Sequence, residues 1–563
     1  MQAFRNANVT TVANNGQIAN SSLVAHTERL QRHFYEVRSK VWCMVGNGLS
    51  NQVFVEGPDG VIAIDSGESV EEMSAALAEL REVCDRPVVA VIYSHFHYVN
   101  GTAALFDGSQ EPDEVWGHAL IETNLARMAS EIGPVARRGL ILQFGTDLPE
   151  EGPDGLVNVG LGLRYRQAEH APFTPGFVPP THTIDTETET SIAGLRVVLR
   201  PAPSDADDNL TIWFPDLGVC VNNLVWPALF NVFALRGEEY RDPRILLDGI
   251  DHIIELGADH LIGAHGPPIS GASRITEEVT AYRDSIQFLW DQTVRHVNQG
   301  LTSSEVGAAV ELPAVFNDSY LTQQHYGLAE HHARQIYAGL RGWFDGDPAN
   351  LFPLDPNDRA QRMIDGFGGP ERVRVLCDEA CGSGDLRWAL ELAGWLTRSP
   401  DCEPHDQRRL ATALRLIGQR TTSANVRNWA LTTAREAEGT ADLSRHRTFG
   451  FGYRAALTTD PGAALASLRV AVDPDAAVGA DGVVAFVVDG LTHTVQLRRC
   501  VLVPSDGIDP DVTVVLDRTC FAELLSGRLT IAEAEAARRL EIIGDRTRLQ
   551  AFCGAIELAG FVL

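Results

Sequence analysis

Residues 91–102 read VIYSHFHYVNGT, an apolar run of strand type followed by a polar turn that ends in glycine. The run delivers two histidines, His95 and His97, one residue apart. On an extended strand, residues i and i+2 project to the same side, so both imidazoles can face one metal ion about 2 Å away. We therefore expect a metal site at the end of this strand.

A pair of imidazoles needs a third ligand from elsewhere in the chain. His265, in the segment GAHGPP, is the best candidate, because it ends another apolar strand and precedes Gly266, which permits close backbone approach. The alternative is that His95 and His97 are exposed strand-end histidines without a ligand. The strand context and the distant GAHG segment favour the metal site.

The flanking sequence predicts an α/β unit. Residues 51–67 (NQVFVEGPDGVIAIDSG) have the pattern of a β-hairpin, and residues 69–84 that of an amphipathic helix with an acidic first turn. A buried strand follows from residue 87 and leads to His95. This order places the histidine pair at the carboxyl end of a strand, where α/β sheets hold their chemistry. Further strands over 188–223, a helix over 243–256 and a strand over 260–268 complete the unit.

The pattern changes twice after this unit. From about Ser273 to residue 440, long helical segments predominate, which predicts an all-helical middle domain. Beyond about Pro461 strands return and are followed by helices. We expect a metal domain at 1–275, a helical domain at 276–440 and an α+β domain at 441–563.

Composition excludes several classes of protein. The chain has 563 residues and a formal net charge of -29, so binding to nucleic acid through clustered Lys and Arg is not expected. We see no run of about 18 uncharged apolar residues and no secretory signal, so we expect no membrane span. The nine scattered cysteines, an odd number, favour buried thiols in a reducing cytoplasm.

The histidine motif resembles the His-x-His-x-Asp-His signature of the metallo-β-lactamase superfamily. Longer stretches resemble its alkylsulfatase branch, and they are residues 48–67, 209–243 (NLTIWFPDLGVCVNNLVWPALFNVFALRGEEYRDP), 291–313 and 331–356. The resemblance implies an N-terminal αββα sandwich, an all-α dimerisation domain that makes a homodimer, and a C-terminal α+β sterol-carrier-like domain that covers the active site.

The resemblance also implies a ligand set. The first metal of the family would be held by His95, His97 and His265, and the bridging glutamate of the family falls at Asp205, as ligand or general base. Asp205 keeps a carboxylate but is shorter by one methylene. The alternative for Asp205 is a solvated loop acid beside Asp207.

The ligands of the family's second metal fall at Val99, Asn100 and Asn223. Valine has no donor atom, and an amide carbonyl is a weak ligand for a borderline-soft metal. We therefore expect one divalent metal per subunit in a centre of three histidines and Asp205. Zinc is the expected ion, with iron or manganese as alternatives.

The positions that hold sulfate in the family fall at Asn231 and Arg236. A guanidinium can donate two parallel hydrogen bonds to a tetrahedral oxyanion. A histidine of the family, one residue before the asparagine, is replaced here by Phe230. The alternative for Arg236 is a surface ion pair.

These features predict a metal-dependent hydrolase that acts on a sulfate ester or a related small, anionic amphiphile. A non-hydrolytic metalloenzyme, such as an iron-dependent oxygenase or a lyase, is the second hypothesis, because the same ligands suit iron. A catalytically degenerate protein that binds lipid or acts as a scaffold is the third.

Overall fold

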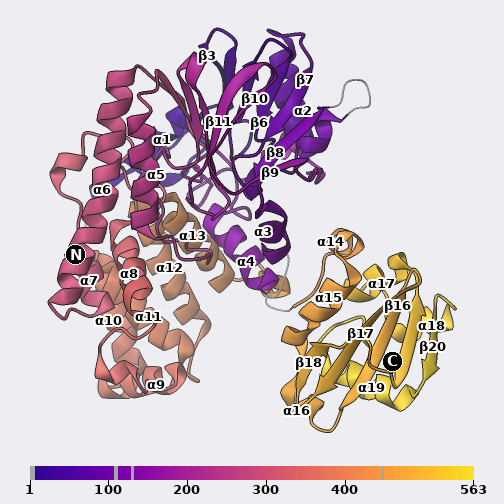
Figure 1. Ribbon diagram of the computed structural model, residues 1–563. Helices are drawn as coiled ribbons and strands as arrows, with labels where there is room; N and C mark the ends of the chain where they lie inside the picture. The colour runs from indigo at the N-terminus through magenta and orange to yellow at the C-terminus, as the bar shows by residue number, and fades with distance from the viewer. Residues whose placement is uncertain (1–6, 107–111, 129–131, 447–448) are drawn as a thin grey trace. The chain divides into compact units, whose positions relative to one another are not determined.

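The computed structural model describes residues 7–106, 112–128, 132–446 and 449–563. Contacts within the chain define two compact units, one of Met1–Leu125 with Gly139–Asp442 and one of Ala126–Arg138 with Leu443–Leu563 (Figure 1). Among the described residues, none of the helices combines the length and the apolar character that a membrane crossing needs.

The first unit contains a seven-stranded sheet, whose strands are paired in chain order. The strands are β3 His33–Arg38, β4 Val41–Val45, β5 Gln52–Glu56, β6 Val61–Ile64, β7 Val88–Ile92, β8 Glu114–His118 and β9 His182–Ile184. Strands β3 to β6 are antiparallel and β6 to β9 are parallel. The hairpin predicted over 51–67 is confirmed as β5 and β6, and the predicted helix as α2, Val70–Arg81.

A six-stranded sheet follows, again paired in chain order. Its strands are β10 Thr188–Ile192, β11 Leu195–Pro201, β12 Leu210–Phe214, β13 Val219–Asn222, β14 His260–Gly263 and β15 Ile269–Ser270. Strands β13 and β14 are parallel, because helix α5, Pro243–Glu255, connects them.

The two sheets face each other across one apolar core. Alternation along β4 sends Val41 and Cys43 into this core, where they meet side chains of the second sheet such as Leu199. Trp42 and Met44 point to the other face, which α2 covers. Helix α5 covers the outer face of the second sheet. The expected αββα sandwich is therefore confirmed.

Helices make up the first unit after strand β15, as the sequence predicts. They are α6 Ala272–Asn298, α7 Ser303–Ala309, α8 Ala329–Arg341, α9 Pro356–Gly366, α10 Pro370–Ser383, α11 Leu386–Arg398, α12 Pro404–Arg420 and α13 Ala424–Ala437. Helices α6 and α8 share the apolar core of α5. The contacts do not separate the helices from the sandwich, so the boundary at residue 275 stays a prediction.

The second unit is an α+β fold around a five-stranded sheet with the order β18-β17-β16-β19-β20. The strands are β16 Gly482–Val488, β17 Leu491–Arg498, β18 Val501–Pro504, β19 Val512–Leu516 and β20 Leu540–Gly544. Its longer helices are α17 Arg518–Leu525 and α19 Arg546–Ala555, and both contribute to one apolar core with the sheet.

Candidate metal centre

The two histidines of the motif converge just beyond strand β7. His95 continues the extended backbone, with φ -171° and ψ 177°, and Phe96–Tyr98 then form a turn of 3₁₀-helix. His95 Nε2 lies 3.0 Å from His97 Nδ1. The side chains therefore meet because the chain turns after His95. The strand alternation from which the sequence argument started does not extend to His97.

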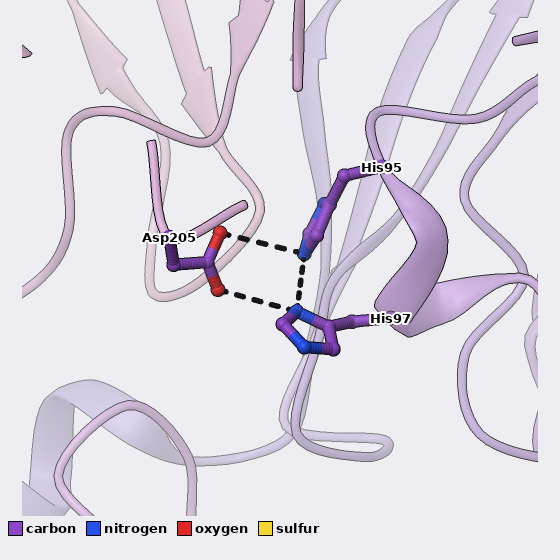
Figure 2. Close-up of side chains that lie close together, drawn as sticks. All are labelled: His95, His97 and Asp205. Atoms are coloured by element: carbon purple, nitrogen blue, oxygen red, sulfur yellow. Dashed lines mark hydrogen bonds and ion pairs between the residues drawn. The ribbon is translucent and has the colours of Figure 1, made fainter. Parts of the chain in front are cut away.

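Asp205 reaches the same point from the loop between β11 and β12. Its Oδ2 lies 3.2 Å from His97 Nδ1, and its Oδ1 lies 3.8 Å from His95 Nε2 (Figure 2). One ligand atom of each residue lies within 4.8 Å of the other two. The Asp205 side chain is only 6% exposed, so Asp205 is not a solvated loop acid.

Burial and charge separate the protonation states of these groups. Burial lowers the pKa of His95 to about 3. Burial also opposes the charged form of His97, but the hydrogen bond and the charge of Asp205 outweigh it and raise the His97 pKa. Burial acts against the Asp205 carboxylate as well, yet the two histidines hold its pKa well below the usual range. Asp205 therefore keeps its negative charge at neutral pH.

Ser94 and Asp65 orient the His95 ring from behind. Asp65 follows β6 and accepts hydrogen bonds from Ser94 N at 2.7 Å and from Ser94 Oγ at 2.6 Å. Since the Ser94 hydroxyl donates to Asp65, its oxygen is left to accept from His95 Nδ1, 2.8 Å away. This arrangement places the lone pair of the His95 ring on Nε2, the nitrogen that faces Asp205 and His97.

His265 follows β14 and turns its free nitrogen toward Tyr98. His265 Nδ1 donates to the carbonyl oxygen of Leu49 at 2.9 Å, so the lone pair lies on Nε2. The Tyr98 hydroxyl lies 3.3 Å from that Nε2. His265 is therefore prepared to act as a ligand through Nε2. It lies outside the group of three whose ligand atoms lie within 4.8 Å of one another.

The three positions matched to a second metal have other structural roles. Val99 is fully buried in the apolar core beneath α2. The backbone of Asn100 pairs with Gly67 and Gly176.

The Asn223 amide is engaged at both ends. Its Nδ2 donates to Asp205 Oδ1 at 2.7 Å and to Asn209 Oδ1 at 2.8 Å. Its Oδ1 accepts from Trp226 Nε1 at 2.9 Å. The carbonyl oxygen is therefore already held by the indole, and the amide N–H groups face the Asp205 carboxylate.

Arg236 lies beside the histidines, in the loop before α5, but it already has a partner. It forms an ion pair with Glu238, and Glu238 also pairs with Arg241. Glu238 Oε1 lies 3.9 Å from His97 Nε2. The Arg236 side chain is 12% exposed, so its ion pair is not on the surface.

Asn231 has an unpaired side chain in the same region. Among the described residues, neither Asn231 Nδ2 nor Oδ1 has a hydrogen-bond partner, although both are buried. His332 Nε2 is also buried without a hydrogen-bond partner among the described residues. The side chains of His332 and Asn231 both lie against Gly327. Because His332 Nδ1 accepts from the backbone of Phe233, its Nε2 carries the proton. The side-chain amide nitrogen of Asn231 and Nε2 of His332 are therefore buried donors that can each bind an acceptor.

Sequence reasoning missed five residues of this region, namely Asp65, Ser94, Glu238, Arg241 and His332. The charges of the segment RGEEYRD directly follow a long apolar run, which is a signal for a buried charge cluster. The left-handed backbone of Asp65, with φ 57°, has no local sequence signal beyond the following Ser66-Gly67.

Comparison with known families gives three matches. Residues 45–98 match the metallo-beta-lactamase superfamily, residues 302–440 match alkyl sulfatase dimerisation domains, and residues 455–560 match alkyl sulfatase C-terminal domains. The matches therefore follow the order of the expected domains.

Relatives are similar along nearly the whole chain. The chain is 30% identical over 522 residues to linear primary-alkylsulfatase of Pseudomonas sp., covering 89% of this chain and 98% of the relative. It is 28% identical over 536 residues to alkyl/aryl-sulfatase BDS1 of Saccharomyces cerevisiae, covering 92% and 81%. The solved structure of the stereoselective inverting sec-alkylsulfatase Pisa1 from Pseudomonas sp. aligns with a TM-score of 0.83 at 25% identity, over 99% of this chain and 89% of that one.

Proposed function

The chain belongs to the alkylsulfatase family of the metallo-β-lactamase superfamily, and we propose that it hydrolyses the sulfate ester of an amphiphilic substrate at a centre with one metal ion. The observation that carries this proposal is the convergence of His95 Nε2, His97 Nδ1 and the Asp205 carboxylate. The two N–H groups of Asn231 and His332, buried and open, add donors suited to an anion.

The donor atoms fit a divalent ion. Ser94 and Leu49 bind the Nδ1 atoms of His95 and His265, which leaves both Nε2 atoms as ligand nitrogens. We assign His95, His97 and Asp205 as ligands, with His265 completing the set and zinc as the expected ion. Such an ion, when bound, lowers the pKa of a coordinated water to about 7 and polarises an ester oxygen.

The residues around the centre have distinct tasks. Asp205 Oδ2 lies 3.2 Å from His97 Nδ1, and the low pKa of Asp205 keeps it ionised as a ligand at neutral pH. Arg236 and Asn231 orient the anionic group of the substrate. Asn223 fixes Asp205 from the other side.

We propose a single ion because Val99 has no ligand atom, and because the amide oxygens of Asn100 and Asn223 are weak ligands for a second ion. Metal analysis of the purified chain tests this, and we expect one equivalent per subunit. Removal of the ion by a chelator should abolish sulfate release, and one equivalent of zinc should restore it. Two tightly bound ions per subunit would contradict the single-metal centre, and absence of sulfate release from alkyl sulfates by the metal-replete protein would contradict the hydrolase.

One observation keeps a second function open. Two histidines and one carboxylate are also the ligand set of non-haem Fe(II) oxygenases. Elemental analysis together with measurement of oxygen consumption separates the two functions. A zinc centre without oxygen uptake excludes the oxygenase.

A further inference from the structure

Glu238 is the common partner of two arginines that lie beside the metal centre. Its carboxylate pairs with Arg236 through one oxygen and with Arg241 through the other. The exposed fractions of the three side chains are 17% for Glu238, 12% for Arg236 and 4% for Arg241. Because solvent screens these charges only weakly, the Glu238 carboxylate binds both guanidinium groups and occupies some of their hydrogen-bond donors.

The Glu238 carboxylate also faces the metal-binding residues. Its Oε1 lies 3.9 Å from His97 Nε2, and that nitrogen is buried without a hydrogen-bond partner among the described residues. An anion bound by Arg236 next to the His97 ring would therefore occupy the position that the Glu238 carboxylate now holds. Arg241 holds the Glu238 carboxylate at this position through Nη2. Its Nη1 donates to the carbonyl oxygen of Asn231 at 2.6 Å, which keeps the guanidinium in place.

A carboxylate and a sulfate group are both oxyanions that accept paired hydrogen bonds from a guanidinium. We propose that Glu238 is a built-in competitor of the anionic group of the substrate, and that it must turn away from Arg236 and Arg241 before that group binds. This inference rests on the proposed function for the identity of the anion, a sulfate group. Gly237 adjoins Glu238 and has φ 86°, and a Cβ atom added there would meet no atom within 4 Å outside its chain neighbours, so the backbone beside Glu238 borders open space.

Competition of this kind lowers the apparent affinity for an anion by the fraction of molecules in which Glu238 is turned away. Removing the negative charge should therefore tighten anion binding. Glu238→Gln keeps the size and a hydrogen-bonding side chain while it removes the charge. Its matched control is Glu239→Gln, the adjacent exposed residue, which removes the same charge from the surface.

The test is calorimetric titration of the full-length protein with inorganic sulfate, at an ionic strength kept constant with sodium chloride. We expect Glu238→Gln to bind sulfate about tenfold more tightly or better, and Glu239→Gln to bind it like the unchanged protein. Equal or weaker binding by a folded Glu238→Gln variant, or no sulfate binding by any of the three proteins, overturns the inference.

The loss of a buried partner can also reduce stability, because two arginines then lack a counter-charge. If Glu238→Gln is folded but too unstable for calorimetric titration, the increase in melting temperature with sulfate is compared instead. A larger increase than in the unchanged protein supports the inference, and an equal or smaller one overturns it. Neither measurement needs turnover. If Glu238→Gln binds sulfate more tightly but the protein hydrolyses no ester, the proposed hydrolase activity is wrong. The competition between Glu238 and an anion is still supported in that case.

Discussion

Asn223 shows how one side chain limits what this centre can hold. Its amide donates to Asp205 and Asn209 while its oxygen accepts from Trp226. A carboxylate in its place would only accept hydrogen bonds and would stand against Asp205 Oδ1 at about the same short distance. Two carboxylates so close repel each other unless a cation lies between them or one of them holds a proton. The amide stabilises Asp205 without one, which agrees with a single ion.

Asp205→Asn tests the carboxylate at the residue scale. The change keeps the size of the side chain but removes the charge that attracts a metal ion and raises the pKa of His97. We expect metal affinity and sulfate release to fall by at least about 100-fold, measured by metal analysis and by a sulfate-release assay. Asp207→Asn, an exposed carboxylate of the same loop, should change neither. Full activity of Asp205→Asn would remove Asp205 from the mechanism.

Helix α2 has a buried carboxyl in its first turn, and this carboxyl makes stability depend on pH. Glu72 is 2% exposed and accepts hydrogen bonds from Gln52 and from the backbone of Glu68. Burial, and then the charge of Glu68, raise its pKa to about 8. The folded protein therefore binds a proton that the unfolded chain releases above about pH 4.3. The contribution of protonated Glu72 to the free energy of unfolding is fully present below that pH. It is lost as the pH rises toward 8, by at most about 1.4 kcal/mol per pH unit.

Glu72→Gln removes this titration. We expect the melting temperature of the variant to fall less than that of the unchanged protein between pH 5.5 and pH 8. The comparison of the two slopes is its own control, because other titrating groups contribute equally to both proteins. Parallel slopes would show that Glu72 is ionised in the folded state at neutral pH.

The segment after helix α8 exposes large apolar side chains within the region that matches dimerisation domains. Trp343 is 77% exposed and Phe352 is 92% exposed, and Leu354 follows at 49%. Apolar side chains gathered in this way are typical of a protein interface. We propose that these side chains pack against a second copy of the chain in a homodimer.

Light scattering tests the homodimer. We expect a mass twice the 61.3 kDa of one chain, and we expect Phe352→Asp to shift the protein toward the monomer, because it places a charge in the interface. Val478→Asp, at an exposed valine of the second unit, should leave the mass unchanged. A monomeric unchanged protein would contradict the proposal.

At the scale of the whole molecule, the second unit has its own sheet and its own apolar core. Its match to alkyl sulfatase C-terminal domains predicts that it covers the apolar tail of the substrate. Truncation after residue 445 should then weaken turnover of long-chain alkyl sulfates about tenfold or more, since burial contributes about 0.8 kcal/mol for each CH₂ group. Turnover of a short-chain ester serves as the internal control. Equal effects on both substrates would exclude the covering role.

Local patterns were sufficient for most of the elements and for part of the site. The alternation in β5 and β6, and the apolar spacing of α2, correspond directly to faces of the sandwich. The histidine motif was identified because its residue type and spacing suit a metal ion, and Asp205 was identified only through the resemblance to the family. Glu238 and Arg241 were missed, since a charged run in a loop has the same composition whether it lies in solvent or inside the protein.

The sequence by itself determined the strands and helices of the α/β unit and the order of the domains, and it predicted the histidine ligands, because periodicity and ligand chemistry are local properties of the chain. The tertiary structure alone decided that the 3₁₀ turn aims His97 at Asp205, that Tyr98 faces His265, and that Glu238 stands against His97. These contacts join loops from different strands. Their distances depend on how the two sheets and the loop before α5 pack, which no local pattern specifies.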